Sequence, residues 1–193
     1  MFKLFLSIFA VLMVYVSSFG TSYVQAQQFN KLDDVSFELV SLSRKDRFSS
    51  LIYGSVEHVS DGDTIVVRAK SGEKIKVRLY AIDAPEKAQP YGPQSAGVLK
   101  NLVLYRYIAL DVINTDRYGR QVAVVYLDRQ DINAEMIKLG AAWHYRYYDK
   151  SSNYNYYEKS EQLARANCRG LWNRDCPTPP WEYRKMMREQ SRK

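Results

Sequence analysis

The sequence predicts an α+β protein built on a five-stranded Greek-key β-barrel with three helices. Five short runs rich in Val, Ile and Tyr are separated by turns that contain Gly, which is typical of consecutive strands. One helical pattern follows the third run and two follow the fifth, an order that favours a barrel of the OB type. At 193 residues the chain is long enough for one such domain with short terminal extensions.

The first 26 residues have the pattern of a secretory signal peptide. Lys3 precedes a nearly unbroken apolar run that ends at Val16, and Val24-Gln25-Ala26 offers small residues for cleavage. The alternative is an uncleaved anchor, because the uncharged residues 4–28 are long enough for a bilayer-spanning helix of about 20 residues. We expect an exported protein, periplasmic or secreted, that meets the membrane only transiently through this segment.

Three further segments follow the predicted signal peptide. Residues 27–50 are polar and without periodicity, which predicts a linker or a loosely docked arm. The folded domain is expected over residues 51–176. A basic tail, residues 177–193, then ends the chain, and we favour a solvated helix end over a weak phosphate-binding arm.

The chain has a formal net charge of +7, and removal of Lys3 with the signal peptide leaves +6. A basic surface fits a polyanionic partner, because each Lys or Arg that meets a phosphate releases counterions. It also fits a protein that charge merely keeps soluble. Charge alone therefore leaves both interpretations open.

The strand pattern also predicts which side chains face the core. In the third run Ile75, Val77 and Leu79 alternate with charged residues, so that Arg78 faces away from the core. A turn with Gly119 separates the last two runs, since glycine permits a tight reversal. The expected strands cover residues 51–60, 64–70, 74–82, 107–113 and 121–127.

The three helices are predicted from capping residues and helical spacing. Gly92 and Pro93 form a start signal for a helix over residues 93–106. Asn133 is a good N-cap for a second helix that ends at Gly140. The third helix covers about residues 153–167, where Tyr156, Leu163 and Ala166 lie at helical spacing.

Cys168 and Cys176 are the only two cysteines and lie beyond the signal peptide. Because an exported protein meets an oxidising compartment, we predict a disulfide between them that pins the chain end. His58 and His144 are distant and lie in no metal-binding motif, which disfavours a zinc site and a histidine-based metal nuclease.

Acidic side chains gather where predicted strands meet turns, at Asp63, Asp83 and Glu86. Carboxylate and carbonyl oxygens from short loops are the ligands that calcium prefers. The alternative is that Asp61-Gly62 is an ordinary hairpin turn and the other acids lie on a solvated loop. Arg78 and Arg120, taken singly, are likewise ordinary surface charges.

The combination of motifs is more specific than any single one. Four motifs occur in one order at close spacing, and the similarity extends from about Tyr53 to Trp172. The chain thereby resembles the staphylococcal nuclease family. The motifs are Asp61-Gly62-Asp63-Thr64, Val77-Arg78-Leu79, Ile82-Asp83-Ala84-Pro85-Glu86 and Tyr118-Gly119-Arg120.

The resemblance implies a monomeric, calcium-dependent endonuclease that hydrolyses phosphodiester bonds of DNA and RNA, single- or double-stranded, with little sequence preference. It implies 5′-hydroxyl and 3′-phosphate products and no protein partner. The implied calcium ligands are Asp63, Asp83 and the backbone carbonyl of Ala84, and the implied catalytic residues are Arg78, Glu86 and Arg120. The implied substrate-binding residues are Arg117, Tyr118, Tyr148 and Arg146.

Two departures from the family prototype concern substrate binding. Only residues 87–90 separate the Pro-Glu and Tyr-Gly-Pro motifs, where the prototype has a longer lysine-rich loop. Arg146 takes the place of a pocket tyrosine, although Tyr145, Tyr147 and Tyr148 surround it in the sequence and aromatic rings stack on bases. The alternative, which we favour, is that these tyrosines are half-buried packing residues beside a helix.

The main alternative is an OB-fold module that binds nucleic acid without catalysis. Such a module is expected to lack at least one charged residue of the site. A structural envelope protein with an uncleaved anchor is a third alternative, and it explains none of the motifs. All five charged positions carry the family's type, which favours an enzyme: Asp63, Arg78, Asp83, Glu86 and Arg120.

Overall fold

The computed structural model describes residues 51–173 and 177–192. The predicted signal peptide and the predicted linker, residues 27–50, lie outside this part of the chain. Within it, no helix combines the length and the apolar character needed to span a bilayer.

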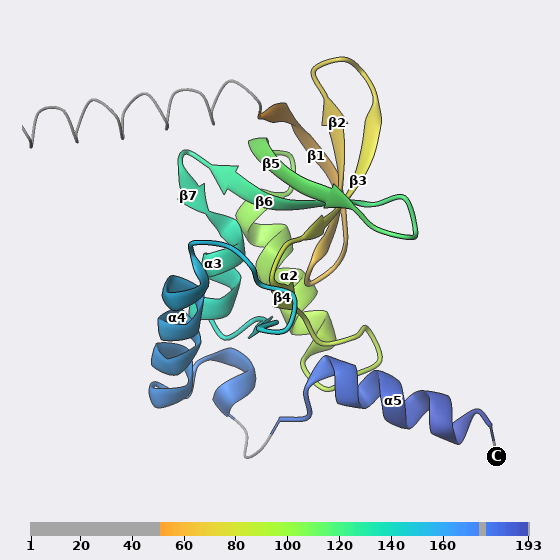
Figure 1. Cartoon of the computed structure of the whole chain (residues 1–193), viewed down its shortest axis with the longest axis vertical. Coiled ribbons are helices and arrows are strands. Elements are labelled where there is room, and N and C mark those ends of the chain that lie inside the picture. The colour runs from red at the N-terminus through yellow and green to blue at the C-terminus, as the bar shows by residue number, and fades with distance from the viewer. Residues whose placement is uncertain (1–50, 174–176, 193) are drawn as a thin grey trace, which may run out of the picture. The chain divides into compact units, whose positions relative to one another are not determined.

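Five strands form the barrel (Figure 1). Antiparallel pairing joins β1 with β2, β2 with β3, β1 with β5, and β5 with β6. A parallel pairing of β3 with β6 closes the sheet, so the predicted OB-type barrel is confirmed. The strands are β1 (Ile52–Asp61), β2 (Thr64–Ala69), β3 (Lys74–Leu79), β5 (Tyr107–Thr115) and β6 (Gln121–Leu127).

The third predicted strand is interrupted before its expected end at residue 82. β3 stops at Leu79, and Ala81 adopts the left-handed conformation with φ 57°. The chain then leaves the barrel and forms β4 (Ile82–Asp83), which pairs with β8 (Trp143–His144). The break places Asp83 outside the barrel sheet, where it pairs with Trp143 of β8. One more short strand, β7 (Gln130–Asp131), pairs antiparallel with the end of β6.

Alternation along β3 separates buried from exposed side chains as predicted. Ile75, Val77 and Leu79 are buried in the barrel core, whereas Lys74 and Lys76 are exposed. The predicted pattern fails at Tyr80, which is also buried because it lies beyond the end of the strand. Its hydroxyl accepts a hydrogen bond from the backbone N–H of Lys150 at 2.7 Å.

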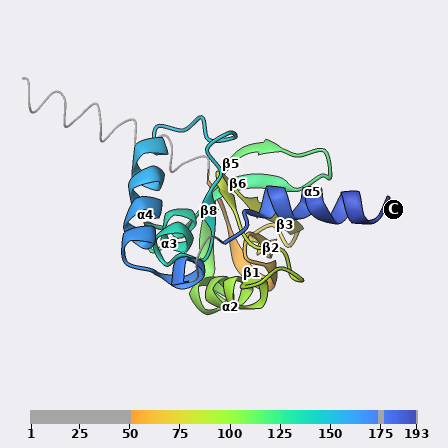
Figure 2. The ribbon, with the colours of Figure 1, turned by 90° about the horizontal axis from the view of Figure 1, so that it is seen from below.

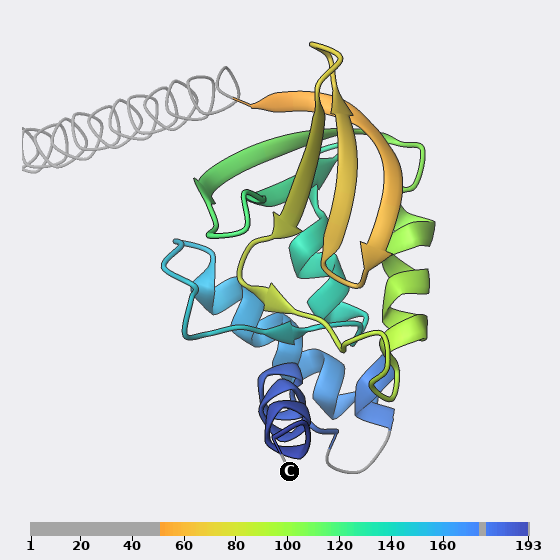
Figure 3. The same ribbon diagram turned by 90° about the vertical axis from the view of Figure 1, so that its right-hand side faces the viewer.

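Four α-helices and one 3-10 helix accompany the barrel in the described residues, so the predicted number of three was too low. α2 lies against β1, and α3 contacts both β6 and α4 (Figures 2 and 3). The fourth, α5, lies in the segment predicted as a tail. The helices are α2 (Gly92–Val103), α3 (Ile132–Lys138), α4 (Tyr154–Ala166), η1 (Gly170–Asn173) and α5 (Pro180–Gln190).

The ends of α2 differ from the prediction. Tyr91, not Gly92, is the N-cap and has φ 71°. A side chain at Gly92 would place its Cβ 2.0 Å from the carbonyl oxygen of Glu86, so glycine permits this close approach. The helix ends at Val103 rather than residue 106, because Leu104 is extended and Tyr105 adopts a left-handed conformation.

Asn133 does not cap α3, which corrects the prediction. The cap is Asp131, whose side chain accepts from the N–H of Ala134 at 2.9 Å. Asn133 is instead fully buried inside the first turn. Its amide group accepts from the N–H of Val125 and donates to the carbonyls of Tyr80 and Ala123, and so joins α3 to the barrel.

The packed face of α4 also differs from the prediction. Tyr156 and Leu163 are 56% and 57% exposed. Tyr157, Ser160, Glu161 and Ala164 are buried instead. The carboxylate of Glu161 tolerates burial because Arg146 and Arg165 neutralise it.

The predicted disulfide falls partly outside the described residues, because Cys176 lies there. Cys168 is exposed, and it forms no disulfide with any described residue. The Cys168–Cys176 bridge therefore stays a prediction.

Candidate active site

The turn between β1 and β2 positions the first acids of the site. The N–H of Asp63 donates to Oδ1 of Asp61 at 3.1 Å, and the hydroxyl of Thr64 donates to Oδ1 of Asp63 at 2.9 Å. At Gly62, an added Cβ would lie 1.9 Å from Oγ of Ser95. Glycine therefore lets this turn pack directly against α2.

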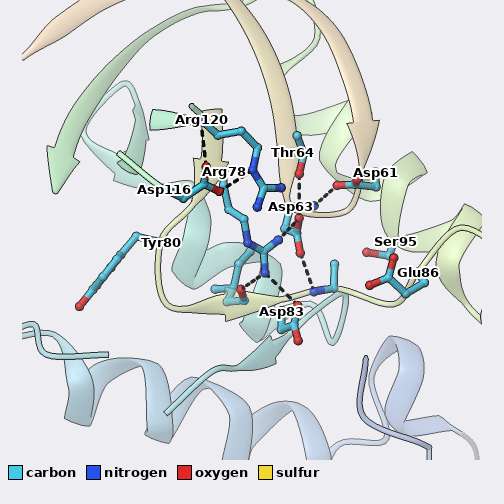
Figure 4. Close-up of polar contacts among 12 residues, drawn as sticks. Asp61, Asp63, Thr64, Arg78, Tyr80, Asp83, Glu86, Ser95, Asp116 and Arg120 are labelled. Atoms are coloured by element: carbon cyan, nitrogen blue, oxygen red, sulfur yellow. Dashed lines mark hydrogen bonds and ion pairs between the residues drawn. The ribbon is translucent and has the colours of Figure 1, made fainter. Parts of the chain in front are cut away.

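Arg78 on β3 joins the two buried aspartates. Its Nη1 forms an ion pair with Oδ1 of Asp63, and its Nη2 donates to Oδ1 of Asp83 at 2.9 Å (Figure 4). Nη2 also lies 3.3 Å from the carbonyl oxygen of Ile82, to which it donates. The side chain faces away from the barrel core, as predicted, yet only 19% of it is exposed because the acids cover it.

The segment from β4 onward completes the acidic cluster. The N–H of Ala84 donates to Oδ2 of Asp63 at 3.0 Å, which ties this segment to the β1–β2 turn. Glu86 follows on the loop toward α2, where its N–H donates to Oε1 of Gln89 at 3.1 Å. The acids thus come from two segments that the fold brings together, the β1–β2 turn with Asp61 and Asp63, and β4 with the loop after it, which carry Asp83 and Glu86 (Figure 4).

The electrostatic environment differs between the acids. Burial opposes ionisation of Asp63, but the charge of Arg78 and the hydrogen bond from Ala84 outweigh it and lower the pKa of Asp63. Burial raises the pKa of Asp83 despite its guanidinium partners. Burial and the charge of Asp63 raise the pKa of Asp61 to about 6. Asp63 is therefore more readily ionised than Asp61 and Asp83.

Arg120 is held by a separate hairpin. Its Nε donates to Oδ2 of Asp116 at 2.7 Å, and its N–H donates to Oδ1 of the same residue at 3.0 Å. Arg78 pairs with Val122 across the β3–β6 closure, and Arg120 lies two residues before Val122. Arg120 itself directly precedes β6, and Figure 4 shows its side chain extending toward the same part of the site as Arg78.

The predicted substrate-binding residues fall into two groups. Arg117 and Tyr118 lie at the exposed tip of the Arg120 hairpin, where the Arg117 guanidinium stacks on the Tyr118 ring at 4.8 Å. Tyr148 is exposed and contacts the Tyr145 ring. Arg146 is paired with Glu161 at 2.6 Å, and with Glu158 at 3.5 Å, so its charge is already compensated. Their binding role stays a prediction.

Arg184 on α5 is a residue of this cluster that the sequence did not indicate. Its guanidinium donates to both carboxylate oxygens of Asp83, at 3.2 and 2.8 Å, and to Oε1 of Glu86 at 2.7 Å. No motif includes it, and a polar helix far along the chain gives no sign of its contacts. Only the docking of α5 reveals it.

The residues fit a hard divalent cation by chemistry. The predicted donors are two carboxylates, Asp63 and Asp83, and one backbone carbonyl, that of Ala84, and oxygen ligands are those that calcium prefers. Among the described residues, no three His, Cys, Asp or Glu side chains converge as a metal-binding group. A set of two side chains and one carbonyl does not require three.

The fold and the site together define an OB-fold protein with a cluster of carboxylate and guanidinium groups. Guanidinium groups are well suited to bind phosphate oxygens. Comparison with protein families matches residues 76–174 to the family described as "Staphylococcal nuclease homologue". The chain belongs to this staphylococcal nuclease family. The predicted family, and with it the nuclease class of hydrolase, is confirmed.

Curated relatives agree with this assignment. The chain is 42% identical over 130 residues to an "Uncharacterized endonuclease" of Haemophilus influenzae, with 67% of this chain and 71% of the relative covered. It is 40% identical over 134 residues to an "Uncharacterized endonuclease" of Escherichia coli O157:H7, with 69% and 85% covered. It is 38% identical over 141 residues to a "Micrococcal nuclease" of Shigella flexneri, with 68% and 80% covered.

Proposed function

We propose that this chain is an exported, calcium-dependent nuclease that hydrolyses phosphodiester bonds of DNA and RNA with little sequence preference. The observation that carries the proposal is the guanidinium of Arg78, held between buried Asp63 and Asp83. Glu86 lies on the loop that leads from Asp83 toward α2. The relatives named endonuclease and micrococcal nuclease support the same activity.

Arg78 and Arg120 are the groups that bind the scissile phosphate. Attack of water on phosphorus builds negative charge on the phosphoryl oxygens, and guanidinium groups meet such oxygens with paired, charge-assisted hydrogen bonds. Arg78 lies on β3, and Arg120 directly precedes β6, the strand that pairs with β3. A phosphate placed between them would receive donors from two directions.

Glu86 acts on the attacking water. Its carboxylate orients the water or accepts its proton while the water oxygen bonds to phosphorus. The bond from phosphorus to the 5′ oxygen breaks, and that oxygen leaves with the electron pair and takes up a proton. The products are a 5′-hydroxyl and a 3′-phosphate.

Asp63, Asp83 and the carbonyl of Ala84 would hold the calcium ion. The ion supplies Lewis-acid stabilisation of the phosphoryl oxygens when it is bound. The low pKa of Asp63, which results from Arg78 and the Ala84 N–H acting against burial, keeps this carboxylate ionised for that purpose. Asp83 is fully buried, so it is fixed in place before any ligand arrives.

Substrate contacts outside the reacting phosphate are proposed for two exposed regions. Arg117 and Tyr118 at the hairpin tip offer a cation and a ring, and Tyr148 offers a second ring. Charges that contact phosphates carry no sequence information, and stacking accepts every base. Low sequence preference and activity on both DNA and RNA, single- or double-stranded, follow from such contacts. We propose that the protein acts as a monomer.

Export is proposed from the N-terminal sequence alone, where Lys3 precedes the apolar run. The mature protein is expected to begin near Gln27, and N-terminal sequencing of the protein recovered outside the cytoplasm tests this. A protein that retains residues 1–26 and stays with the membrane would contradict cleavage.

The activity is tested with the purified chain from Gln27 onward. We expect degradation of plasmid DNA and of RNA with calcium, loss of activity on chelation, and a decrease of about 10²–10⁴-fold in Glu86→Gln, the range for loss of a general base. Degradation is followed by gel electrophoresis, and end-labelling identifies the 5′-hydroxyl. Binding of DNA without cleavage would favour the non-catalytic OB-fold module, and full activity in chelator would exclude the metal.

A further inference from the structure

Helix α5 is docked at the acidic cluster through contacts that do not involve the acids. The Trp181 ring stacks on Tyr145, with ring centroids 5.3 Å apart and planes inclined by 2°. The hydroxyl of Tyr183 donates to the carbonyl of Ala88 at 3.2 Å. Just before the helix, the carbonyl of Thr178 accepts from Nε2 of Gln89 at 2.6 Å. These contacts fix α5 beside the loop that carries Glu86 (Figure 3).

Arg184 extends from this helix to two acids of the proposed site. Nη1 donates to Oε1 of Glu86 at 2.7 Å and to Oδ1 of Asp83 at 3.2 Å, and Nη2 donates to Oδ2 of Asp83 at 2.8 Å. The planar guanidinium therefore holds both carboxylates in a fixed relation, which the point charge of a lysine does not reproduce. Among the described residues, Oε2 of Glu86 has no hydrogen-bond partner and is left for water.

The charges of the cluster are compatible with Arg184 and a divalent cation at the same time. The cluster contains four carboxylates and two guanidinium groups, which leaves an excess of two negative charges when all of them are ionised. One divalent cation would balance this excess in number of charges. The groups counted are Asp61, Asp63, Asp83 and Glu86 as acids, and Arg78 and Arg184 as cations.

We propose that Arg184 is a positioning residue of the active site, which orients Glu86 toward the attacking water and fixes Asp83 beside it. The proposal rests on the proposed nuclease function. Arg184 does not touch the phosphate in this role. Its contribution comes from holding the carboxylate of Glu86 in one place on an otherwise exposed loop, and a misplacement of about 1 Å in such a group costs about a hundredfold in rate.

The kinetic test compares substitutions on one face of α5. Arg184→Ala is expected to lower kcat about a hundredfold with little change in KM, and Arg184→Lys to recover only part of the loss, because lysine lacks the fork. Arg188→Ala is the matched control, since this exposed arginine lies one turn further along α5 and forms no ion pair with any described residue. It is expected to keep the kcat of the parent chain.

A second measurement does not depend on activity. The melting temperatures of Arg184→Ala, Glu86→Ala and the double variant are compared in calcium-free buffer. Because the two side chains contact each other directly, the shift of the double variant should be smaller than the sum of the single shifts by about 2 °C. Additive shifts would overturn the contact on which the proposal depends.

The outcomes separate this proposal from the proposed function. A parent chain without calcium-dependent cleavage overturns the nuclease itself. An active parent chain together with an unchanged kcat in Arg184→Ala overturns only the role of Arg184. A kcat that rises in Arg184→Ala also overturns it, since α5 would then be an inhibitory cover over the site.

Discussion

The two arginines proposed to bind phosphate are held in different ways. Arg78 lies between the buried carboxylates of Asp63, in the β1–β2 turn, and Asp83, on β4. Arg120 is held by Asp116, four residues away in its own hairpin. Arg78 therefore takes part in the internal charge balance of the fold, whereas Arg120 depends on a local turn. Loss of Arg78 is therefore expected to lower both the stability of the fold and the activity, and loss of Arg120 the activity alone.

The largest effect on stability is expected for Arg78→Ala. Its removal leaves Asp63 without its guanidinium and Asp83 with Arg184 alone, and breaking a buried ion pair from one side costs about 3–5 kcal/mol in the free energy of unfolding. Urea denaturation of the variant and the parent chain measures this difference. A loss below about 1 kcal/mol would mean that the cluster relaxes without Arg78.

Arg120→Ala is expected to separate activity from stability. The proposed loss of a phosphate-binding donor lowers kcat by about 10²–10³-fold. The free energy of unfolding should change by less than about 1 kcal/mol, because the pair with Asp116 lies within a surface hairpin. DNA cleavage and urea denaturation are measured on the same preparation. Equal losses of stability in Arg120→Ala and Arg78→Ala would remove the contrast between them.

The smallest expected effect concerns the pKa of Asp116. Partial burial raises this pKa, but the hydrogen bonds from Arg120 and Tyr118 outweigh it and lower the value below its usual range. A lowered pKa favours the ionised form in the folded state, so its contribution to stability is present above the unfolded pKa and is lost as pH falls through the folded pKa. NMR titration should show the pKa rising in Arg120→Ala. An unchanged value would show that backbone donors alone hold the carboxylate.

Local patterns in the sequence predicted most of the barrel and the acids of the site. Alternation predicted the buried face of β3, and the order of the motifs predicted that Asp63, Arg78 and Asp83 belong together. These features depend on residues close in sequence or on strand periodicity. They are therefore accessible without a structure.

Features that depend on distant contacts were missed or misassigned. Asn133 is a residue type that often caps helices. Here its side-chain amide instead forms hydrogen bonds with the backbone of Val125, Tyr80 and Ala123. Glu161 is buried on α4 because Arg146 from another segment neutralises it. Arg184 reaches Asp83 only because α5 docks through Trp181. Periodicity carries no information about such partners.

The parallel pairing of β3 with β6 has a consequence for folding. This pairing brings Arg78 and the start of β6, which follows Arg120, together, and it joins segments that β4, α2 and β5 separate in the chain. Contacts between such segments form only after the entropy of closing a long loop has been overcome. Partly folded chains in which β3 and β6 are not yet paired would therefore lack a complete site. The time at which DNA cleavage appears during refolding would then report when the barrel closes.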